Sequence, residues 1–176
     1  MTEVTSPQSD LERLIPTEAI EELEYELTKY PANKRRSAVM AGLMIAQRCN
    51  NGYLSEELMN AVADYLGIPH VAAYEVATFY TMYNLKPVGE HVINVCTNIS
   101  CMLRGSDKVM AHLEDRLAIK VGETTPDNKF TLFEVECAGA CKDAPMFEMD
   151  EVYFENLTPE KIDQILDDAL AKNGGE

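Results

Sequence analysis

Four cysteines in the second half of the chain form two closely spaced pairs, and paired thiolates of this kind are typical metal ligands. Cys96 and Cys101 have four residues between them. Cys137 and Cys141 have three, which are the small residues of the stretch "ECAGAC". Alanine and glycine leave backbone N–H groups uncovered, so these groups can approach an object that the sulfurs hold. The fifth cysteine, Cys49, lies far from both pairs.

Three kinds of site compete for the paired cysteines. A [2Fe–2S] cluster takes four thiolates, and a structural zinc site with four cysteines prefers pairs separated by about two to four residues. A dithiol redox pair normally has the spacing C-x-x-C, which neither pair shows, so it is the weakest interpretation. Spacing alone separates the cluster from zinc poorly, but the small residues favour the cluster because amides directed at sulfur tune its potential. His70, His91 and His112 occur singly and are expected to be surface or packing residues.

Composition excludes several classes of partner. The chain has 176 residues, of which 46% are hydrophobic and 26% charged, as in an ordinary globular protein. Its 30 acidic and 15 basic residues give a net charge of -15. Such a surface repels nucleic acid phosphates and anionic lipids, so we expect no nucleic acid partner and no direct membrane contact. The acidity serves either solubility alone or docking to a partner, and composition does not separate the two.

The cysteines are expected to work in a reducing compartment. The first ten residues, "MTEVTSPQSD", contain no basic segment followed by an apolar core, so we expect no secretory signal. The longest apolar run, "AVMAGLMIA", is too short to span a bilayer. A cytoplasmic location follows as the expectation. Because structural disulfides are rare there, clustered cysteines more often hold metal or carry out redox chemistry.

The first half of the chain has helical periodicity. Apolar residues recur at helical spacing in four segments, which predict helices over about 17–30, 34–49, 56–66 and 69–83. We expect these helices to form a bundle domain over 15–83, preceded by a flexible tail over 1–14 and followed by a linker over 84–90. The second helix is apolar nearly all round, which predicts that it is buried together with Cys49.

The second half alternates between strand and helix patterns and positions the cysteine pairs. Strands are predicted over 91–96 and 129–137, two short strands over 146–155, and helices over 100–118 and 157–172. This order predicts an α/β domain over 91–176 with a mixed sheet of about four strands, so the fold class of the whole chain is α+β. Each cysteine pair lies where a strand gives way to a loop, so both pairs can converge on one object. Cys101 is expected at a helix N-terminus, where the dipole lowers a thiol pKa.

The flanks of the cysteine pairs carry a family resemblance. "CTNISCMLRG" and "ECAGACKDAPMFEMDEVYFENLTPEKIDQIL" resemble the small [2Fe–2S] subunits of respiratory complex I, the E subunits of bacterial NADH:quinone oxidoreductases. The resemblance extends over "GYLSEELMNAVADYLGIP" and "AYEVATFYTMY". It implies a helical N-terminal part, a thioredoxin-like C-terminal domain, and Cys96, Cys101, Cys137 and Cys141 as the ligands of one [2Fe–2S] cluster. Ala138 departs from the leucine that is common in relatives, which concerns local packing and not ligation.

The resemblance also implies partners. The sequence has no G-x-G-x-x-G and no phosphate-binding loop, so NADH and FMN are expected on another subunit and no complete active site on this chain. The implied partners are the flavoprotein subunit of the NADH dehydrogenase module and the large iron–sulfur subunit nearby, in the peripheral arm of an inner-membrane complex. Docking is expected through the helical domain, especially Tyr74, Phe79, Tyr80 and Tyr83, although an ordinary core helix explains these residues equally well. Alternatives are the same subunit in a soluble NAD-linked hydrogenase or formate dehydrogenase, and a zinc-stabilised adaptor without redox role.

Charges near the cysteines predict the redox behaviour of such a cluster. Reduction adds negative charge, so the carboxylates of Glu134, Glu136 and Asp143 oppose it, while Arg104 and Lys142 favour it. We expect a low potential, near the plant-type ferredoxin value of roughly −400 mV.

Overall fold

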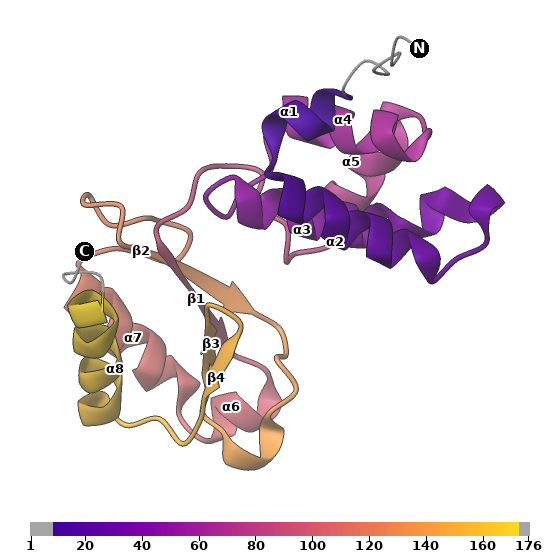
Figure 1. Cartoon of the computed structure of the whole chain (residues 1–176). Coiled ribbons are helices and arrows are strands. Elements are labelled where there is room, and N and C mark those ends of the chain that lie inside the picture. Colours follow the sequence, from indigo (N-terminus) through magenta and orange to yellow (C-terminus); the bar gives the residue numbers. More distant parts are fainter. Residues whose placement is uncertain (1–8, 173–176) are drawn as a thin grey trace, which may run out of the picture. The chain divides into compact units, whose positions relative to one another are not determined.

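The computed structural model describes residues 9–172, with side chains for residues 9–171 (Figure 1). The chain divides into two units, Met1–Pro87 and Val88–Glu176, and each has a hydrophobic core of its own. The division falls inside 84–90, the segment whose proline and glycine content predicts a linker. None of the helices in the described residues is long and apolar enough to cross a membrane.

The first unit is helical. Its elements are α1 (Asp10–Leu14), α2 (Thr17–Thr28), the 3₁₀ helix η1 (Ala32–Ala38), α3 (Val39–Cys49), α4 (Glu56–Leu66) and α5 (His70–Phe79). Local chemistry sets several of these ends. Ser55 caps α4 by accepting a hydrogen bond from the Leu58 N–H at 3.2 Å. Gly67 ends α4 in the left-handed conformation at φ 68°, which glycine adopts without strain. Pro69 then caps α5.

Helix α1 corrects the prediction of a flexible tail over 1–14. Ser9 and Glu12 form a reciprocal capping box, with the Ser9 N–H donating to the Glu12 carboxylate at 2.7 Å. The helix is anchored because Leu11 is fully buried against the other helices of the unit. A single turn is too short to display helical periodicity, which explains why the sequence pattern does not reveal it. Residues 1–8 lie outside the described part of the chain.

Two other helices are shorter than the sequence predicts. The segment predicted as one helix over 34–49 is a 3₁₀ turn followed by α3, with a kink at Lys34. Helix α5 ends at Phe79 and not at Tyr83. Tyr83 folds back into the core, where it is 5% exposed and its hydroxyl donates to the Met40 carbonyl at 2.9 Å. Buried Gln47 fixes the same segment by accepting from the Asn84 N–H at 2.7 Å.

The second unit is the predicted α/β domain. Its elements are β1 (His91–Cys96), α6 (Ile99–Leu103), α7 (Ser106–Leu117), β2 (Phe130–Val135), the 3₁₀ turn η2 (Cys141–Asp143), β3 (Phe147–Met149), β4 (Val152–Phe154) and α8 (Pro159–Lys172). The sheet order is β2-β1-β3-β4, with β1 and β2 parallel and the other neighbours antiparallel. The predicted mixed sheet of four strands is therefore confirmed.

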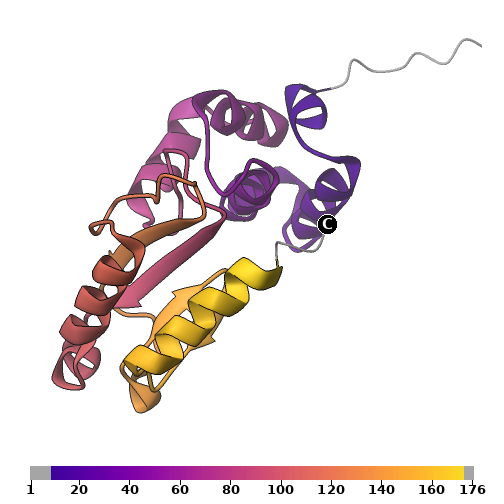
Figure 2. The same ribbon diagram turned by 90° about the vertical axis from the view of Figure 1, so that its left-hand side faces the viewer.

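Helices α7 and α8 lie side by side on one face of this sheet (Figures 1 and 2). Fully buried residues from strands and helices form the core between them, namely Ile93, Val95, Leu113, Leu132, Phe147 and Ile162. At the surface, His112 hydrogen-bonds Asp163 at 3.0 Å and Arg116 pairs with Asp167 at 2.8 Å, so a hydrogen bond and an ion pair link the two helices. The helices thus support the sheet that carries the cysteine loops.

Candidate metal centre

The first cysteine pair lies at the end of β1 and in the helix that follows. Cys96 is the last residue of β1 and Cys101 is in α6. Asn98 begins α6 by accepting a hydrogen bond from the Ile99 N–H at 2.6 Å. Both cysteines are buried, at 2% and 1% exposure. Local helix capping therefore turns the chain so that both sulfurs are enclosed.

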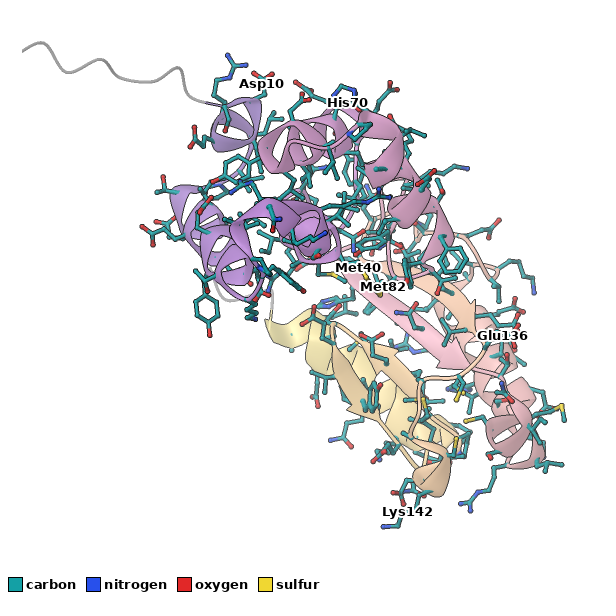
Figure 3. The ribbon with its side chains drawn as sticks, turned by 90° about the vertical axis from the view of Figure 1, so that its right-hand side faces the viewer. Asp10, Met40, His70, Met82, Glu136 and Lys142 are labelled. Carbon is teal, nitrogen blue, oxygen red and sulfur yellow. The ribbon has the colours of Figure 1, made fainter. Side chains whose placement is uncertain are left out.

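The second pair lies in the loop after β2. Cys137 and Cys141 are both exposed, and Cys141 begins the turn η2. Between them, Gly139 has φ 90°, a conformation that residues with a Cβ rarely adopt, so the glycine in "CAGAC" is needed for this bend. Glu136 and Lys142 flank the loop at this end of the sheet (Figure 3).

Parallel strands bring the two pairs together. Cys96 of β1 is in register with Val135 of β2, so the loops that follow these two strands leave the sheet at the same end. The Cys96 thiol donates a hydrogen bond to the Glu136 carbonyl at 3.9 Å and lies near the sulfurs of Cys101 and Cys137, while Cys101 interacts electrostatically with Cys141. The structure thus brings the two cysteine loops near each other, and the prediction that all four sulfurs hold one object stays a prediction. Among the side chains of residues 9–171, no three His, Cys, Asp or Glu residues form a group that could hold a metal ion.

The two buried thiols differ in acidity. Burial disfavours the Cys96 thiolate, but N–H groups of Ala138 and Asn98 and the neighbouring thiols outweigh it, so the pKa of Cys96 lies below its ordinary value. Burial and the adjacent Cys96 sulfur raise the pKa of Cys101 to about 11, against the opposing effect of the Met146 N–H. The sequence-based expectation of a lowered Cys101 pKa is therefore wrong. Helix α6 has only five residues, and its dipole does not offset burial beside a second sulfur.

The backbone amides of Asn98 and Met146 near sulfur are features that sequence reasoning missed, whereas the amide of Ala138 lies in the segment of small residues that predicts such an approach. The N–H groups of Ala138 and Asn98 approach Cys96, and that of Met146 approaches Cys101. Every residue except proline carries an N–H, so no side-chain pattern identifies those that point at a ligand. The small residues between Cys137 and Cys141 were the one signal in the sequence, and Ala138 is among them.

The surrounding charges lie near the surface. Glu134 and Glu136 are exposed, and Asp143 is half-buried. The Glu134 carboxylate accepts a hydrogen bond from the Thr97 hydroxyl at 2.7 Å, which holds it beside the end of β1. The basic residues Arg104 and Lys142 are both exposed. Solvent therefore screens the charges of the four exposed side chains. It screens the charge of the half-buried Asp143 only in part.

The remaining candidate residues lie away from the four cysteines. His70, His91 and His112 each bond an aspartate, at 2.8, 2.5 and 3.0 Å respectively, as expected of packing or surface histidines. Cys49 lies in the helical unit at the end of α3, and it is exposed. The prediction that Cys49 is buried is wrong because α3 turns its last residues toward solvent, where Arg48 pairs with Glu22 at 2.7 Å.

Comparison with known proteins decides the family. The family model of the thioredoxin-like [2Fe-2S] ferredoxin matches residues 23–170. The chain belongs to this family. The match covers both units, and it confirms the resemblance carried by the cysteine motifs and the thioredoxin-like class of the second unit.

Individual relatives of this ferredoxin have names from one group of oxidoreductases. The E subunit of the NADH-quinone oxidoreductase of Rickettsia bellii is 50% identical over 141 residues, which are 80% of this chain and 84% of the relative. The mitochondrial NADH dehydrogenase [ubiquinone] flavoprotein 2 of Dictyostelium discoideum is 47% identical over 85% of this chain and 61% of the relative. An NAD+-reducing [NiFe]-hydrogenase structure matches with a TM-score of 0.64 at 21% identity. That match covers 74% of this chain but 23% of the hydrogenase chain, and it shows the fold alone.

Proposed function

We propose that this ferredoxin is the iron–sulfur electron-transfer subunit of the NADH dehydrogenase module of a complex I-type NADH:quinone oxidoreductase. In this proposal Cys96, Cys101, Cys137 and Cys141 hold one [2Fe–2S] cluster. The observation that carries it is that the loops with the two cysteine pairs follow neighbouring parallel strands and leave the same end of the sheet, in a chain 50% identical to the E subunit of an NADH-quinone oxidoreductase. The finer location proposed is the cytoplasmic side of the inner membrane, in the peripheral arm.

The residues present fit such a cluster. Two irons take four thiolates, and the chain supplies two pairs of cysteines with amide N–H groups directed at the buried pair. Apolar neighbours enclose the buried side, with Ala144 and Met146 fully buried and the small residues Ala138 and Ala140 packed against them. When bound, a [2Fe–2S] cluster takes up and gives up single electrons.

Different groups of this chain would favour or oppose the added negative charge when the proposed cluster is reduced. Amide N–H groups of Asn98, Ala138 and Met146 stabilise negative charge on the sulfurs and so favour the reduced state. The carboxylates of Glu134 and Glu136 oppose added negative charge, but their exposure weakens this effect. The low potential expected from the sequence stays a prediction.

Measurement of iron and acid-labile sulfide tests the proposal. The purified protein is expected to contain two irons and two sulfides per chain and to be red-brown, with visible absorption that bleaches on reduction. A colourless protein that contains zinc and no labile sulfide would support the zinc-stabilised adaptor and overturn the electron-transfer proposal. The subunits that copurify separate complex I from a soluble NAD-linked hydrogenase or formate dehydrogenase.

The proposed partners are the flavoprotein subunit, which would carry FMN and bind NADH, and the large iron–sulfur subunit. The docking surface proposed in the helical unit contains fewer residues than the sequence predicts. Phe79 and Tyr80 are 75% and 39% exposed, and their rings pack edge to face with centroids 4.9 Å apart. Tyr74 is half-buried against the core and Tyr83 is buried within it, so Tyr83 is removed from the docking set.

Truncating this aromatic pair is expected to weaken docking. Tyr80→Ala should reduce the affinity for the flavoprotein subunit by about 2 kcal/mol, roughly 30-fold, if Tyr80 is a buried anchor of the interface. Titration of purified subunits by calorimetry measures it. Tyr25→Ala is the control, since Tyr25 is a 64% exposed tyrosine on α2 and should leave the affinity unchanged. An affinity of Tyr80→Ala equal to wild type would exclude this pair from the interface.

A further inference from the structure

Tyr153 reaches from the edge strand of the sheet to the loop that carries the exposed cysteines. It lies in β4, the last strand in the order β2-β1-β3-β4. Its hydroxyl donates a hydrogen bond to the Ala138 carbonyl at 2.6 Å. The side chain is 52% exposed, so burial alone does not explain its position.

The loop that Tyr153 contacts has few anchors of its own. Residues 137–141 contain two alanines and a glycine at φ 90°, and their cysteines are exposed. Small residues contribute little packing and glycine adds backbone freedom, so such a loop needs contacts from outside to hold one conformation. Within residues 9–171, Tyr153 is the one non-cysteine side chain for which a hydrogen bond to residues 137–140 is found.

Ala138 connects this contact to the buried pair. Its carbonyl accepts a hydrogen bond from the Tyr153 hydroxyl, and its N–H lies near the Cys96 sulfur. The two groups lie on either side of the same Cα atom. The hydrogen bond to the carbonyl therefore limits how far Ala138, and with it the N–H, can move away from the sulfur, although the two groups belong to different peptide planes.

The hairpin that carries Tyr153 is itself tied to the first cysteine pair. Tyr153 is paired with Glu148 of β3, and Phe147 of β3 is paired with Val95 of β1, one residue before Cys96. The Met146 carbonyl accepts from the Cys96 N–H at 3.3 Å. The hairpin thus contacts the buried pair at one end and holds the exposed loop through Tyr153.

We propose that Tyr153 is a positioning residue for the cluster, which holds Ala138 so that its N–H stays directed at the Cys96 sulfur. This inference rests on the proposed function, because it concerns the same four cysteines. An N–H directed at sulfur stabilises the more negative, reduced state, so loss of the restraint lowers the midpoint potential. A looser loop also releases the cluster more readily.

Tyr153→Phe tests the inference because it removes only the hydroxyl. The variant is expected to assemble a full cluster, with a midpoint potential below that of wild type and an altered electron paramagnetic resonance spectrum in the reduced state. Loss of the cluster to an iron chelator should be about tenfold faster, in line with the loss of other outer contacts to metal ligands. Amide hydrogen exchange of a peptide that covers residues 137–141 should also be faster. The control is Tyr65→Phe, which removes a hydroxyl bonded to Glu24 at the same distance of 2.6 Å in the helical unit.

The outcomes separate this inference from the function on which it rests. A red-brown Tyr153→Phe protein with wild-type potential, spectrum and loop exchange would overturn the positioning role and leave the proposed function standing. An equal fall of the potential in Tyr65→Phe would also overturn it, because the effect would then not be specific to the loop. If Tyr153→Phe assembles no cluster, faster exchange of the loop in the apoprotein supports the role and unchanged exchange overturns it. A wild-type protein without iron and labile sulfide overturns both.

Discussion

Replacing Cys137 or Cys141 with alanine is expected to abolish or cripple assembly of the [2Fe–2S] cluster. Each of the four proposed thiolates holds an iron, so removal of one leaves that iron without a protein ligand. Both side chains are exposed, so truncation creates no cavity in the core and should leave the fold intact. Iron content, labile sulfide and visible absorption measure the loss, and circular dichroism checks that the variants are folded.

Cys49→Ala is the matched control for these variants. Cys49 is also an exposed cysteine, but it lies at the end of α3 in the helical unit. Its replacement should leave iron, sulfide and colour unchanged. Full colour in the Cys137 or Cys141 variant, or loss of colour in the Cys49 variant, would show that the ligand assignment is wrong.

Phe147→Ala, in the core of the α/β unit, is expected to lower the unfolding free energy of that unit strongly. Phe147 is fully buried, and its ring lies 5.4 Å from the ring of Phe154, measured between centroids. Truncation of a buried phenylalanine costs about 3–5 kcal/mol of unfolding free energy, a large share of the roughly 5–15 kcal/mol typical of a domain. Because Phe147 is paired with Val95 beside Cys96, we also expect the variant to hold its cluster less firmly.

A urea titration read by hydrogen exchange of separate peptides measures this effect. The two units need not unfold together, so a signal from each is required. In Phe147→Ala, peptides from β1 and β2 should lose their protection from hydrogen exchange at a lower urea concentration than in wild type. The protection of peptides from α3 and α4 should not change. The control Phe79→Ala removes a 75% exposed ring and should shift neither unit by more than about 0.5 kcal/mol. A midpoint for the α/β unit equal to wild type would contradict the core role of Phe147.

Much of this fold is predictable because local signals agree with the packing. Ser55 and Gly67 mark the two ends of α4, and the alternating residues of "HVINVC" form β1. Prediction failed where tertiary contacts override the local pattern. Tyr83 continues the apolar pattern of α5, but its hydroxyl reaches the Met40 carbonyl and the chain leaves the helix.

The placement of the cysteine loops was predictable from the sequence, whereas the surroundings of the sulfurs were not. "CTNISC" and "CAGAC" follow predicted strands, and the parallel pairing of β1 with β2 places both loops at the same end of the sheet. The acidity of Cys101 depends on burial and on a sulfur from a different position in the chain, which spacing does not describe. The hydrogen bond from Tyr153 to the Ala138 carbonyl joins residues that are 15 positions apart in the sequence. Neither residue type predicts such a contact.

The division of the chain at Pro87 separates two properties that mutation can then adjust independently. The four paired cysteines lie in the Val88–Glu176 unit, while Phe79 and Tyr80 lie in the Met1–Pro87 unit with a different core. If Phe79 and Tyr80 dock a partner as proposed, their substitution alters which protein the chain accompanies without disturbing the proposed cluster, which lies in the other unit. One redox module can in this way be adapted to several assemblies.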